Sequence, residues 1–245
     1  KPSLAASIAG FLSEGKHRSR RGGQEVHEFE RDFNGARCHF KVTAVIGHVL
    51  SIDFPAKFQS WDLDPAILFD APVQKKEATP KARVVEHLER EAKGASHLIL
   101  WLDCDREGEN ICFEVIDACA PVMRPNVVGH TFVHRAKFSA VSKESIERAM
   151  RTLGAPNRDE ALAVDARQEL DLKVGVAFTR FQTRFFQGRY SHLDASVISY
   201  GPCQTPTLNF AVQRHLEIVS HTPEDFWSLH VEVRSASLGK TLVTR

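Results

Sequence analysis

The sequence lacks several features that would place it in a specialised class of proteins. No unbroken apolar run exceeds the five residues of Leu98–Leu102, whereas a membrane helix needs roughly 20. None of the five cysteines belongs to a C-x-x-C pair, which disfavours a zinc site and favours free thiols in a reducing compartment. Lys and Arg number 32 against 31 Asp and Glu, so no global basic surplus indicates a polyanionic partner. Such a partner would need a local patch, and the protein is expected to be soluble and intracellular.

The chain is long enough and apolar enough to bury a core. Its 245 residues suit one large domain or two ordinary ones, and 42% of them are apolar. It begins at Lys1 without a Met and ends at Arg245 inside a strand-like run, so we expect a part of a longer protein. The pattern changes after Gly154, which predicts a first domain over 1–154 and a second, incomplete domain over 155–245.

The first elements are predicted from apolar periodicity. Ser3–Leu12 repeats with helical spacing behind a Ser cap, and the basic segment Lys16–Gly23 is expected to be a loop. Apolar residues alternate over Val26–Phe33 and Arg37–Ile46 on either side of an Asn-Gly pair. This pattern predicts two antiparallel strands joined by a tight turn.

Helices and strands then alternate along the chain. Strands are predicted over 97–102 and 127–133, and helices over 81–93, 109–119 and 142–153. This alternation is typical of a parallel α/β sheet. A long helix is expected over 159–187, a further helix over 206–219 and strands from Phe226 onward, so the second part should be mainly helical.

An acidic D-x-D-x-E motif follows the predicted apolar strand. Alternation places Asp103 and Asp105 on one side of the chain, and the turn into the next helix can bring Glu107 beside them. Three carboxylates held this close repel one another unless a cation is present. Mg²⁺ accepts one or two carboxylates together with phosphate oxygens and waters, so the motif predicts a magnesium site for phosphoryl chemistry.

Two other interpretations of this motif stay open at this point. One is an acidic turn exposed to water. The other is an EF-hand, because the calcium-loop pattern is matched at its first, third, fifth, sixth and twelfth positions by Asp103, Asp105, Glu107, Gly108 and Glu114. An EF-hand needs a helix before the loop, whereas the preceding residues have strand periodicity, so we favour the metal site.

The long helix carries two distinct stripes. Arg167 and Asp171 form an i, i+4 pair, and Lys173, Arg180 and Arg184 share a cationic side. The opposite side is predicted to face the core and contains Leu170, Val174, Phe178, Phe181 and Phe185. The cationic stripe suits the phosphates of a nucleic-acid strand, although an ordinary solvated helix face has the same pattern.

Other segments carry weaker signals. His48 ends a strand and, taken alone, is as well explained by a structural role. Arg135 stands in a basic and aromatic segment that could contact phosphate or simply face water. A loop before the helix over 206–219 places polar residues near amide groups that can bind phosphate, namely Ser199, Gly201, Gln204 and Thr205.

Three motifs resemble the type IA DNA topoisomerases, specifically eukaryotic topoisomerase III and in particular its beta form. They are K-P-S-L-A at the start, L-I-L-W-L-D-C-D-R-E-G-E-N-I-C-F-E-V over 98–115 and G-P-C-Q-T-P-T-L over 201–208. The resemblance covers essentially the whole chain. It implies a TOPRIM domain with a Rossmann-like parallel sheet, followed by the start of the mainly helical central domain that binds single strands.

The resemblance also implies roles for individual residues. Asp103, Asp105 and Glu107 would hold Mg²⁺, and Lys1 and Glu107 would be catalytic. A family Glu that directly precedes K-P-S is not in this sequence, which leaves one carboxylate out of the expected set. Nucleic acid would be bound by His48, Arg135, Arg167, Asp171, Arg180, Ser199, Gly201, Gln204 and Thr205. Pro202 stands where most bacterial relatives have an Arg, and this difference indicates the beta form.

The activity implied is an ATP-independent isomerase reaction that relaxes negative supercoils. A Tyr attacks a single-strand phosphodiester, forms a 5′-phosphotyrosyl link, allows a second strand to pass and reseals the first. Tyr190 and Tyr200 are the only tyrosines, and neither lies in the family's Tyr-Pro-Arg-Thr context, so this chain alone is expected to be inactive. The alternatives are a non-catalytic single-strand-binding module with a vestigial TOPRIM site, or another TOPRIM enzyme such as a primase or nuclease.

The same resemblance implies partners and a location. Single-stranded DNA is the expected substrate and RNA a second one. A Tudor-domain protein is an expected partner, no membrane contact is expected, and the protein is expected to be a monomer. The nucleus is the expected location, with the cytoplasm as a second one.

Overall fold

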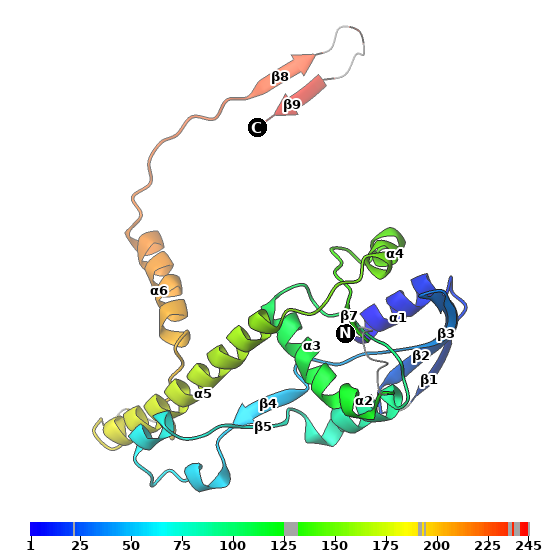
Figure 1. Ribbon diagram of the computed structural model, residues 1–245. Coiled ribbons are helices and arrows are strands. Elements are labelled where there is room, and N and C mark those ends of the chain that lie inside the picture. Colours follow the sequence, from blue (N-terminus) through cyan, green and yellow to red (C-terminus); the bar gives the residue numbers. More distant parts are fainter. Residues whose placement is uncertain are drawn as a thin grey trace. The chain divides into compact units, whose positions relative to one another are not determined.

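The computed structural model describes residues 1–21, 23–124, 132–190, 193, 195–234, 237 and 241–244. Contacts divide the chain into two compact units, Lys1–Gly201 and Pro202–Arg245, which are described separately below (Figure 1). No helix in the described ranges is long and apolar enough to cross a membrane.

The first unit contains an antiparallel sheet near its N-terminus. Strands β1 (Arg18–Arg21), β2 (Glu25–Phe33) and β3 (Ala36–Thr43) lie in that order. The predicted hairpin is confirmed, because Phe33 pairs with Ala36 around Asn34 and Gly35, whose φ angles of 52° and 78° suit an Asn-Gly turn. The loop predicted over 16–23 is wrong for residues 18–21, since this polar segment pairs along its length with β2.

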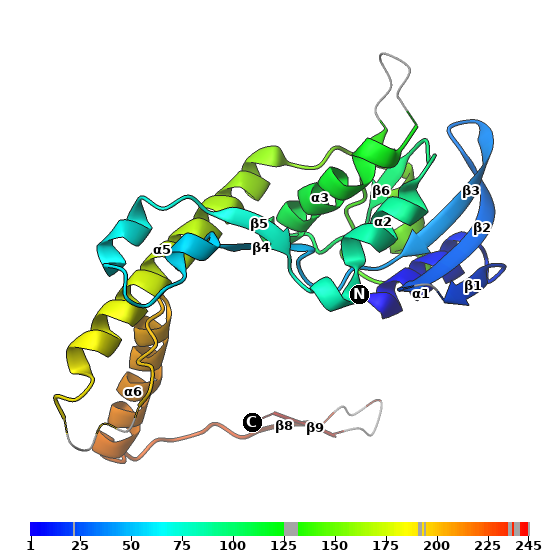
Figure 2. The same ribbon diagram turned by 90° about the horizontal axis from the view of Figure 1, so that it is seen from below.

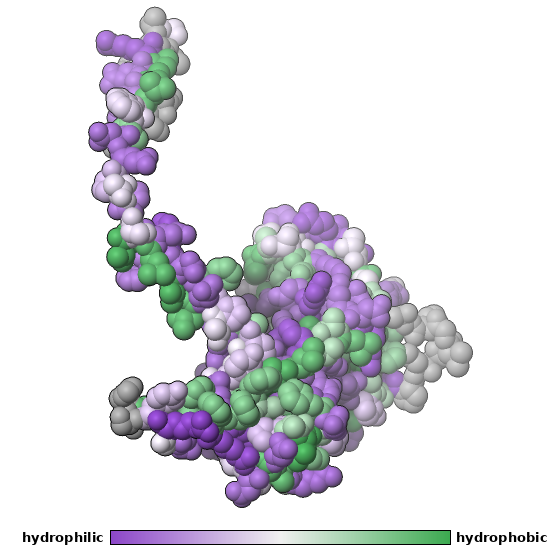
Figure 3. Space-filling view, turned by 90° about the vertical axis from the view of Figure 1, so that its left-hand side faces the viewer, coloured by the Kyte–Doolittle hydropathy of each residue, from purple (hydrophilic) through white to green (hydrophobic). Residues whose placement is uncertain are grey.

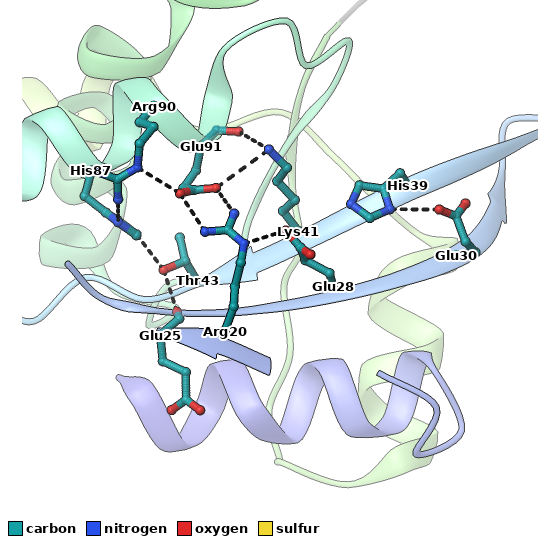
Figure 4. Close-up of polar contacts among 10 residues, drawn as sticks. All are labelled: Arg20, Glu25, Glu28, Glu30, His39, Lys41, Thr43, His87, Arg90 and Glu91. Atoms are coloured by element: carbon teal, nitrogen blue, oxygen red, sulfur yellow. Dashed lines mark hydrogen bonds and ion pairs between the residues drawn. The ribbon is translucent and has the colours of Figure 1, made fainter. Parts of the chain in front are cut away.

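Charged side chains explain why the polar segment forms a strand, and they also attach helix α2 (Val84–Ala92) to the sheet (Figure 4). Arg20 of β1 donates to Glu28 of β2 at 2.7 Å and pairs bidentately with the buried Glu91 of α2. Lys41 of β3 lies 3.7 Å from the same carboxylate. Cross-strand charge pairs therefore replace the apolar alternation that strand prediction relies on.

His87 adds a hydrogen bond between uncharged side chains of α2 and β3. Its Nε2 lies 2.9 Å from the Thr43 hydroxyl, which already donates its own proton to the Glu25 carbonyl at 2.9 Å. Nε2 must therefore carry the ring proton, and Nδ1 accepts from Arg90 at 2.9 Å. Burial lowers the pKa of His87, in agreement with this neutral tautomer.

The parallel sheet predicted for the middle of the chain is confirmed. Strand β6 (Leu98–Leu100) pairs in parallel with β7 (Val133–Arg135), and α3 (Arg106–Cys119) connects them. The strand predicted over 127–133 lies mostly outside the described residues, since only its last two positions fall within them. Leu100 of β6, Leu88 of α2 and Cys112 of α3 belong to one core cluster. Figure 2 shows α2 and α3 on this part of the unit.

A second core cluster joins the predicted first and fourth helices to the antiparallel sheet. Helix α1 (Pro2–Leu12) buries Ile8 and Leu12 against Phe29 of β2 and Ile146 of α4 (Lys143–Arg151). The Ser142 hydroxyl caps α4 by accepting from the Ser145 amide at 3.3 Å. Both helices are confirmed close to their predicted limits.

A small antiparallel pair was not predicted. Strand β4 (Leu50–Asp53) pairs with β5 (Gln74–Glu77), and short 3₁₀ turns lie around them. These turns are η1 (Ala56–Phe58), η2 (Pro65–Phe69) and η3 (Pro80–Ala82), whereas a further turn, η4 (Ala120–Val122), follows α3.

Helix α5 (Arg158–Phe186) confirms the long helix, but several positions on its two stripes differ in burial from the prediction. Leu170, Phe178, Phe181 and Phe185 are 42–63% exposed, whereas Arg180 is buried at 5%. The helix packs on α3, β4 and η2 through small residues, Ala161 and Ala177 among them, because close approach leaves little room for aromatic rings. Figure 3 shows apolar surface mixed with polar surface on one face of the molecule.

The second unit contains the predicted last helix and strands. Helix α6 (Gln204–Ser220) is followed by β8 (Val231–Arg234), which pairs in an antiparallel way with β9 (Thr241–Thr244). The domain boundary expected near residue 154 stays a prediction, and the contact division between Gly201 and Pro202 lies elsewhere.

Candidate functional site

The acidic motif forms a tight turn between β6 and α3, here called the acidic turn (residues 103–107). Asp105 is the N-cap of α3, and its Oδ1 accepts from the Gly108 amide at 2.7 Å. A strand precedes the turn, and the helix already begins at Arg106. The EF-hand interpretation is therefore wrong, because a calcium loop requires a helix before it and an extended twelve-residue loop.

Gly108 and Arg135 hold the acidic turn in shape. A Cβ on Gly108 would lie 2.0 Å from the Asp103 carbonyl oxygen, so only glycine fits there. The Arg135 guanidinium donates to the same oxygen at 2.8 Å. It also donates to the Leu102 carbonyl at 2.9 Å and to the buried Glu109 carboxylate at 2.8 Å.

Arg135 was predicted to contact nucleic acid, and the structure contradicts this. Its side chain is fully buried, and these carbonyls and the Glu109 carboxylate surround the guanidinium beneath the acidic turn. A buried cation is stable only with such a set of acceptors. Arg135 therefore supports the strand end from inside.

Nitrogen donors meet the carboxylates on the outer side of the acidic turn. Lys1 Nζ lies 3.2 Å from Asp103, and Arg167 of α5 donates to Glu107 at 2.6 Å. His48 Nε2 lies 3.2 Å from the second oxygen of Glu107. Residues from three separate segments thus converge on one turn, and each of them was predicted to belong to the functional site.

Arg167 links the acidic turn to the rest of α5. Its second guanidinium nitrogen donates to Asp171 at 3.1 Å, which is the predicted i, i+4 pair. The side chains of Arg167 and Asp171 are about half exposed at 52% and 42%, so both remain accessible to a ligand.

The donor set suits an open magnesium site. In the described part of the chain, no group of three or more His, Cys, Asp or Glu side chains is placed to hold a metal together. Asp103 and Glu107 are about half exposed at the strand end, while one oxygen of Asp105 is used by the helix cap. Mg²⁺ commonly takes one or two carboxylates and completes its shell with water and phosphate, which these residues fit.

Arg180 was also predicted to bind nucleic acid, and the structure contradicts this as well. Its guanidinium donates to three backbone carbonyls around η1, those of Phe58, Gln59 and Ser60, at 2.9–3.2 Å. Burial lowers the pKa of Arg180, with the nearby Arg184 as a smaller cause. The residue fastens the loop after β4 to α5.

The predicted loop residues divide between the two units. Ser199 and Gly201 end the first unit, where Tyr200 is held by a 2.8 Å bond from its amide to the Thr179 hydroxyl of α5. Gln204 and Thr205 are exposed and form the first turn of α6 in the second unit. Their roles stay predictions.

Sequence reasoning missed the importance of Glu114. It was considered only as an EF-hand ligand, whereas its buried carboxylate accepts from His48 Nδ1 at 3.0 Å and from the Val49 amide at 2.8 Å. The available signal was the presence of acidic residues at Glu109 and Glu114 on the side of α3 that also carries Cys112 and Val115. Acidic side chains are rarely buried without a polar partner.

Comparison with protein families shows to which family this chain belongs. Residues 1–139, more than half of the chain, match the family described as the Toprim domain. The chain belongs to the Toprim family. Residues 155–242 match the family described as DNA topoisomerase, so the resemblance to type IA topoisomerases inferred from the motifs is confirmed.

The curated relatives carry matching names. A DNA topoisomerase 3-beta from Arabidopsis thaliana is 58% identical over 235 residues, which are 96% of this chain and 27% of that protein. DNA topoisomerase 3-beta-1 from Homo sapiens is 53% identical over 240 residues, 96% of this chain and 28% of that protein. This chain therefore spans little more than a quarter of these relatives. A solved structure of topoisomerase I from Thermotoga maritima aligns with 73% of this chain and 27% of its own, with 25% identity and a TM-score of 0.48.

Proposed function

We propose that this chain provides the acidic site and part of the strand-binding surface of a type IA topoisomerase III. The observation that carries the proposal is the convergence of Lys1, His48 and Arg167 on the carboxylates of the acidic turn. Acidic groups alone would repel a phosphate, whereas carboxylates interleaved with donors can accept both a divalent cation and a phosphodiester. The names of the relatives support the same reaction class.

In the proposed reaction a Tyr hydroxyl outside this chain loses its proton and its oxygen bonds to phosphorus, while the bond from phosphorus to the 3′ oxygen breaks and that oxygen takes up a proton. Resealing reverses these steps without ATP, because the phosphotyrosyl ester keeps the energy of the original bond. Asp103 and Glu107, with the remaining oxygen of Asp105, would hold Mg²⁺, which supplies positive charge beside the phosphate. Lys1 and Arg167 would orient the phosphate, and Asp171 would hold the Arg167 side chain.

Single-stranded DNA is the proposed substrate, and RNA is proposed as a second one. A Tudor-domain partner, a monomeric state and a nuclear location with a cytoplasmic share belong to the same proposal and follow from the family resemblance. Tyr190 and Tyr200 are not proposed as nucleophiles, since neither lies in the Tyr-Pro-Arg-Thr context that the family resemblance implies. The chain alone should bind strands without relaxing supercoils.

The test is the affinity of this chain for a single-stranded oligonucleotide at several salt concentrations. Arg167→Ala should weaken binding and reduce the salt dependence by roughly one phosphate contact. Arg37→Ala is the matched control, because Arg37 is another exposed arginine, on β3 and far along the chain from the acidic turn. Equal effects of the two changes would show that the surface charge alone matters and would contradict the proposed site.

A vestigial, non-catalytic TOPRIM site is the alternative outcome. Asp103→Asn removes the carboxylate that pairs with Lys1 and should abolish any effect of Mg²⁺ on strand binding. If strand binding by the unchanged chain is already indifferent to Mg²⁺, the non-catalytic binding module is the better description.

A further inference from the structure

We propose that Glu114 is a positioning residue that fixes the His48 ring so that Nε2 faces the acidic turn. This inference deepens the function proposed above and rests on it only where strand binding is measured. Neither Glu114 nor its contact with His48 follows from the D-x-D-x-E motif.

The Glu114 carboxylate is held from three sides. One oxygen accepts from the Val49 and Leu50 amides at 2.8 and 3.3 Å, and the other lies 3.0 Å from His48 Nδ1. Glu114 is 4% exposed, so water cannot replace these partners. Two backbone donors on one oxygen determine which oxygen is left for the imidazole.

This arrangement assigns the ring proton nearest to Glu114. A carboxylate only accepts hydrogen bonds, so Nδ1 of His48 must carry a proton to bond with it. The opposite nitrogen, Nε2, points outward and lies 3.2 Å from Glu107, a carboxylate that likewise only accepts, so this contact needs a proton on Nε2 as well. A buried carboxylate that sets the orientation and tautomer of a histidine is a recurrent device in functional sites.

The contacts that run from Glu114 through His48 end on the acidic turn, which carries the proposed chemistry. One oxygen of Glu107 lies 3.2 Å from Nε2 of His48, and the other accepts a hydrogen bond from Arg167 at 2.6 Å. Both oxygens therefore have defined neighbours, one of which depends on Glu114. His48 itself is about 29% exposed, so its outer edge can reach a ligand at the acidic turn.

Glu114→Gln tests the contact between Glu114 and His48 with little change in the shape of the side chain. The two backbone amides still require an acceptor, so the Gln carbonyl should replace the oxygen that they contact. The Gln amide group, a donor, then faces Nδ1 and conflicts with its proton. Either Nδ1 loses its proton or the ring turns away, as expected when a buried carboxylate behind a histidine becomes an amide.

The direct measurement is ¹⁵N NMR of the histidine rings in this chain, with His48 assigned from its loss in a His48→Gln variant. In the unchanged chain, Nδ1 of His48 should show the shift of a protonated nitrogen, and in Glu114→Gln it should not. Asp117→Asn, an exposed position on the same helix, should leave the signal unchanged. An unprotonated Nδ1 in the unchanged chain overturns the proposal without any variant of Glu114.

The functional measurement is a double-mutant cycle on single-stranded oligonucleotide affinity. Glu114→Gln should weaken binding about tenfold, in the range found when a residue that orients a site histidine is changed. In the His48→Gln background the same change should have no further effect. Equal losses in both backgrounds would mean that Glu114 only stabilises the fold, and would overturn the proposal.

The two measurements separate the inference from the function on which it rests. If His48→Gln leaves strand affinity unchanged while Nδ1 responds to Glu114→Gln as expected, the role of His48 in binding fails and the positioning by Glu114 stands. If Nδ1 does not respond, the positioning role fails whatever the affinity.

Discussion

The guanidinium of Arg135 donates at 2.8 Å to the backbone carbonyl of Asp103, the first acidic residue of the acidic turn. A fully buried cation thus lies directly beneath a cluster of exposed anions, and it contacts their backbone instead of their side chains. The shape of the site consequently depends on a residue that no ligand can touch.

Removing this support should destabilise the chain strongly. Arg135→Met leaves the buried Glu109 carboxylate without its cation and several carbonyls without a donor. Breaking one partner of a buried ion pair costs about 3–5 kcal/mol, so the free energy of unfolding in urea should fall by that amount. Arg37→Met, at an exposed ion pair, should change it by less than about 1 kcal/mol. A small loss for Arg135→Met would mean that the interior relaxes around an unpaired Glu109.

The close approach at Gly108 gives a second prediction. In Gly108→Ala the added Cβ meets the Asp103 carbonyl oxygen at 2.0 Å, so the turn must shift, and stability should fall by about 1–3 kcal/mol. Strand affinity should fall with it. Gly10→Ala in α1 is the control, because no atom lies within 4 Å of its Cβ and alanine favours a helix by roughly 1 kcal/mol. Thermal unfolding of both variants checks the opposite signs.

Two neighbouring residues test the orientation of α5. Arg180→Ala removes a buried side chain that binds three carbonyls, so stability should fall by about 2–4 kcal/mol. Phe181→Ala removes a side chain that is 56% exposed and should cost less than about 1 kcal/mol in this chain. If urea unfolding shows a larger loss of stability for Phe181→Ala than for Arg180→Ala, the phenylalanine side of α5 faces the core, as the sequence predicted.

The ion pairs around Glu91 should make stability fall in acid. Hydrogen bonds from Arg20 lower the pKa of Glu91 from its usual 4.5 to about 2. A lowered carboxyl pKa stabilises the folded state above pH 4.5, and this contribution disappears as pH falls from there toward 2. The contribution is at most about 3 kcal/mol. Urea unfolding at several pH values should show a shallower acid loss in Glu91→Gln, and an unchanged pH profile would exclude Glu91 as its source.

Local sequence patterns predicted the elements better than they predicted their surroundings. The Asn34-Gly35 turn and the long helix were readable because each depends on neighbouring residues. The burial of Arg135 and Arg180 was not, since it arises from carbonyls supplied by distant segments. Strand β1 was missed for a related reason, because the partners of Arg20 lie on β2 and α2.

The sequence predicted that the carboxylates of the acidic turn lie together, but it did not predict which donor pairs with which carboxylate. Spacing placed Asp103 and Glu107 together, whereas their pairing with Lys1, His48 and Arg167 needed the fold. Glu114 had no motif of its own, because its role depends on the amides of Val49 and Leu50.

Strand β1 also affects how copies of this chain meet one another. It is the outer strand of the antiparallel sheet, and its sequence is Arg-Ser-Arg-Arg. An outer strand whose backbone is open on one side can capture a strand from a second molecule and so begin aggregation. A row of arginines makes such a capture unfavourable, since two of these strands placed side by side would repel. Arg20, which attaches α2 to the sheet, therefore also acts with Arg18 and Arg21 to protect this border against misassembly.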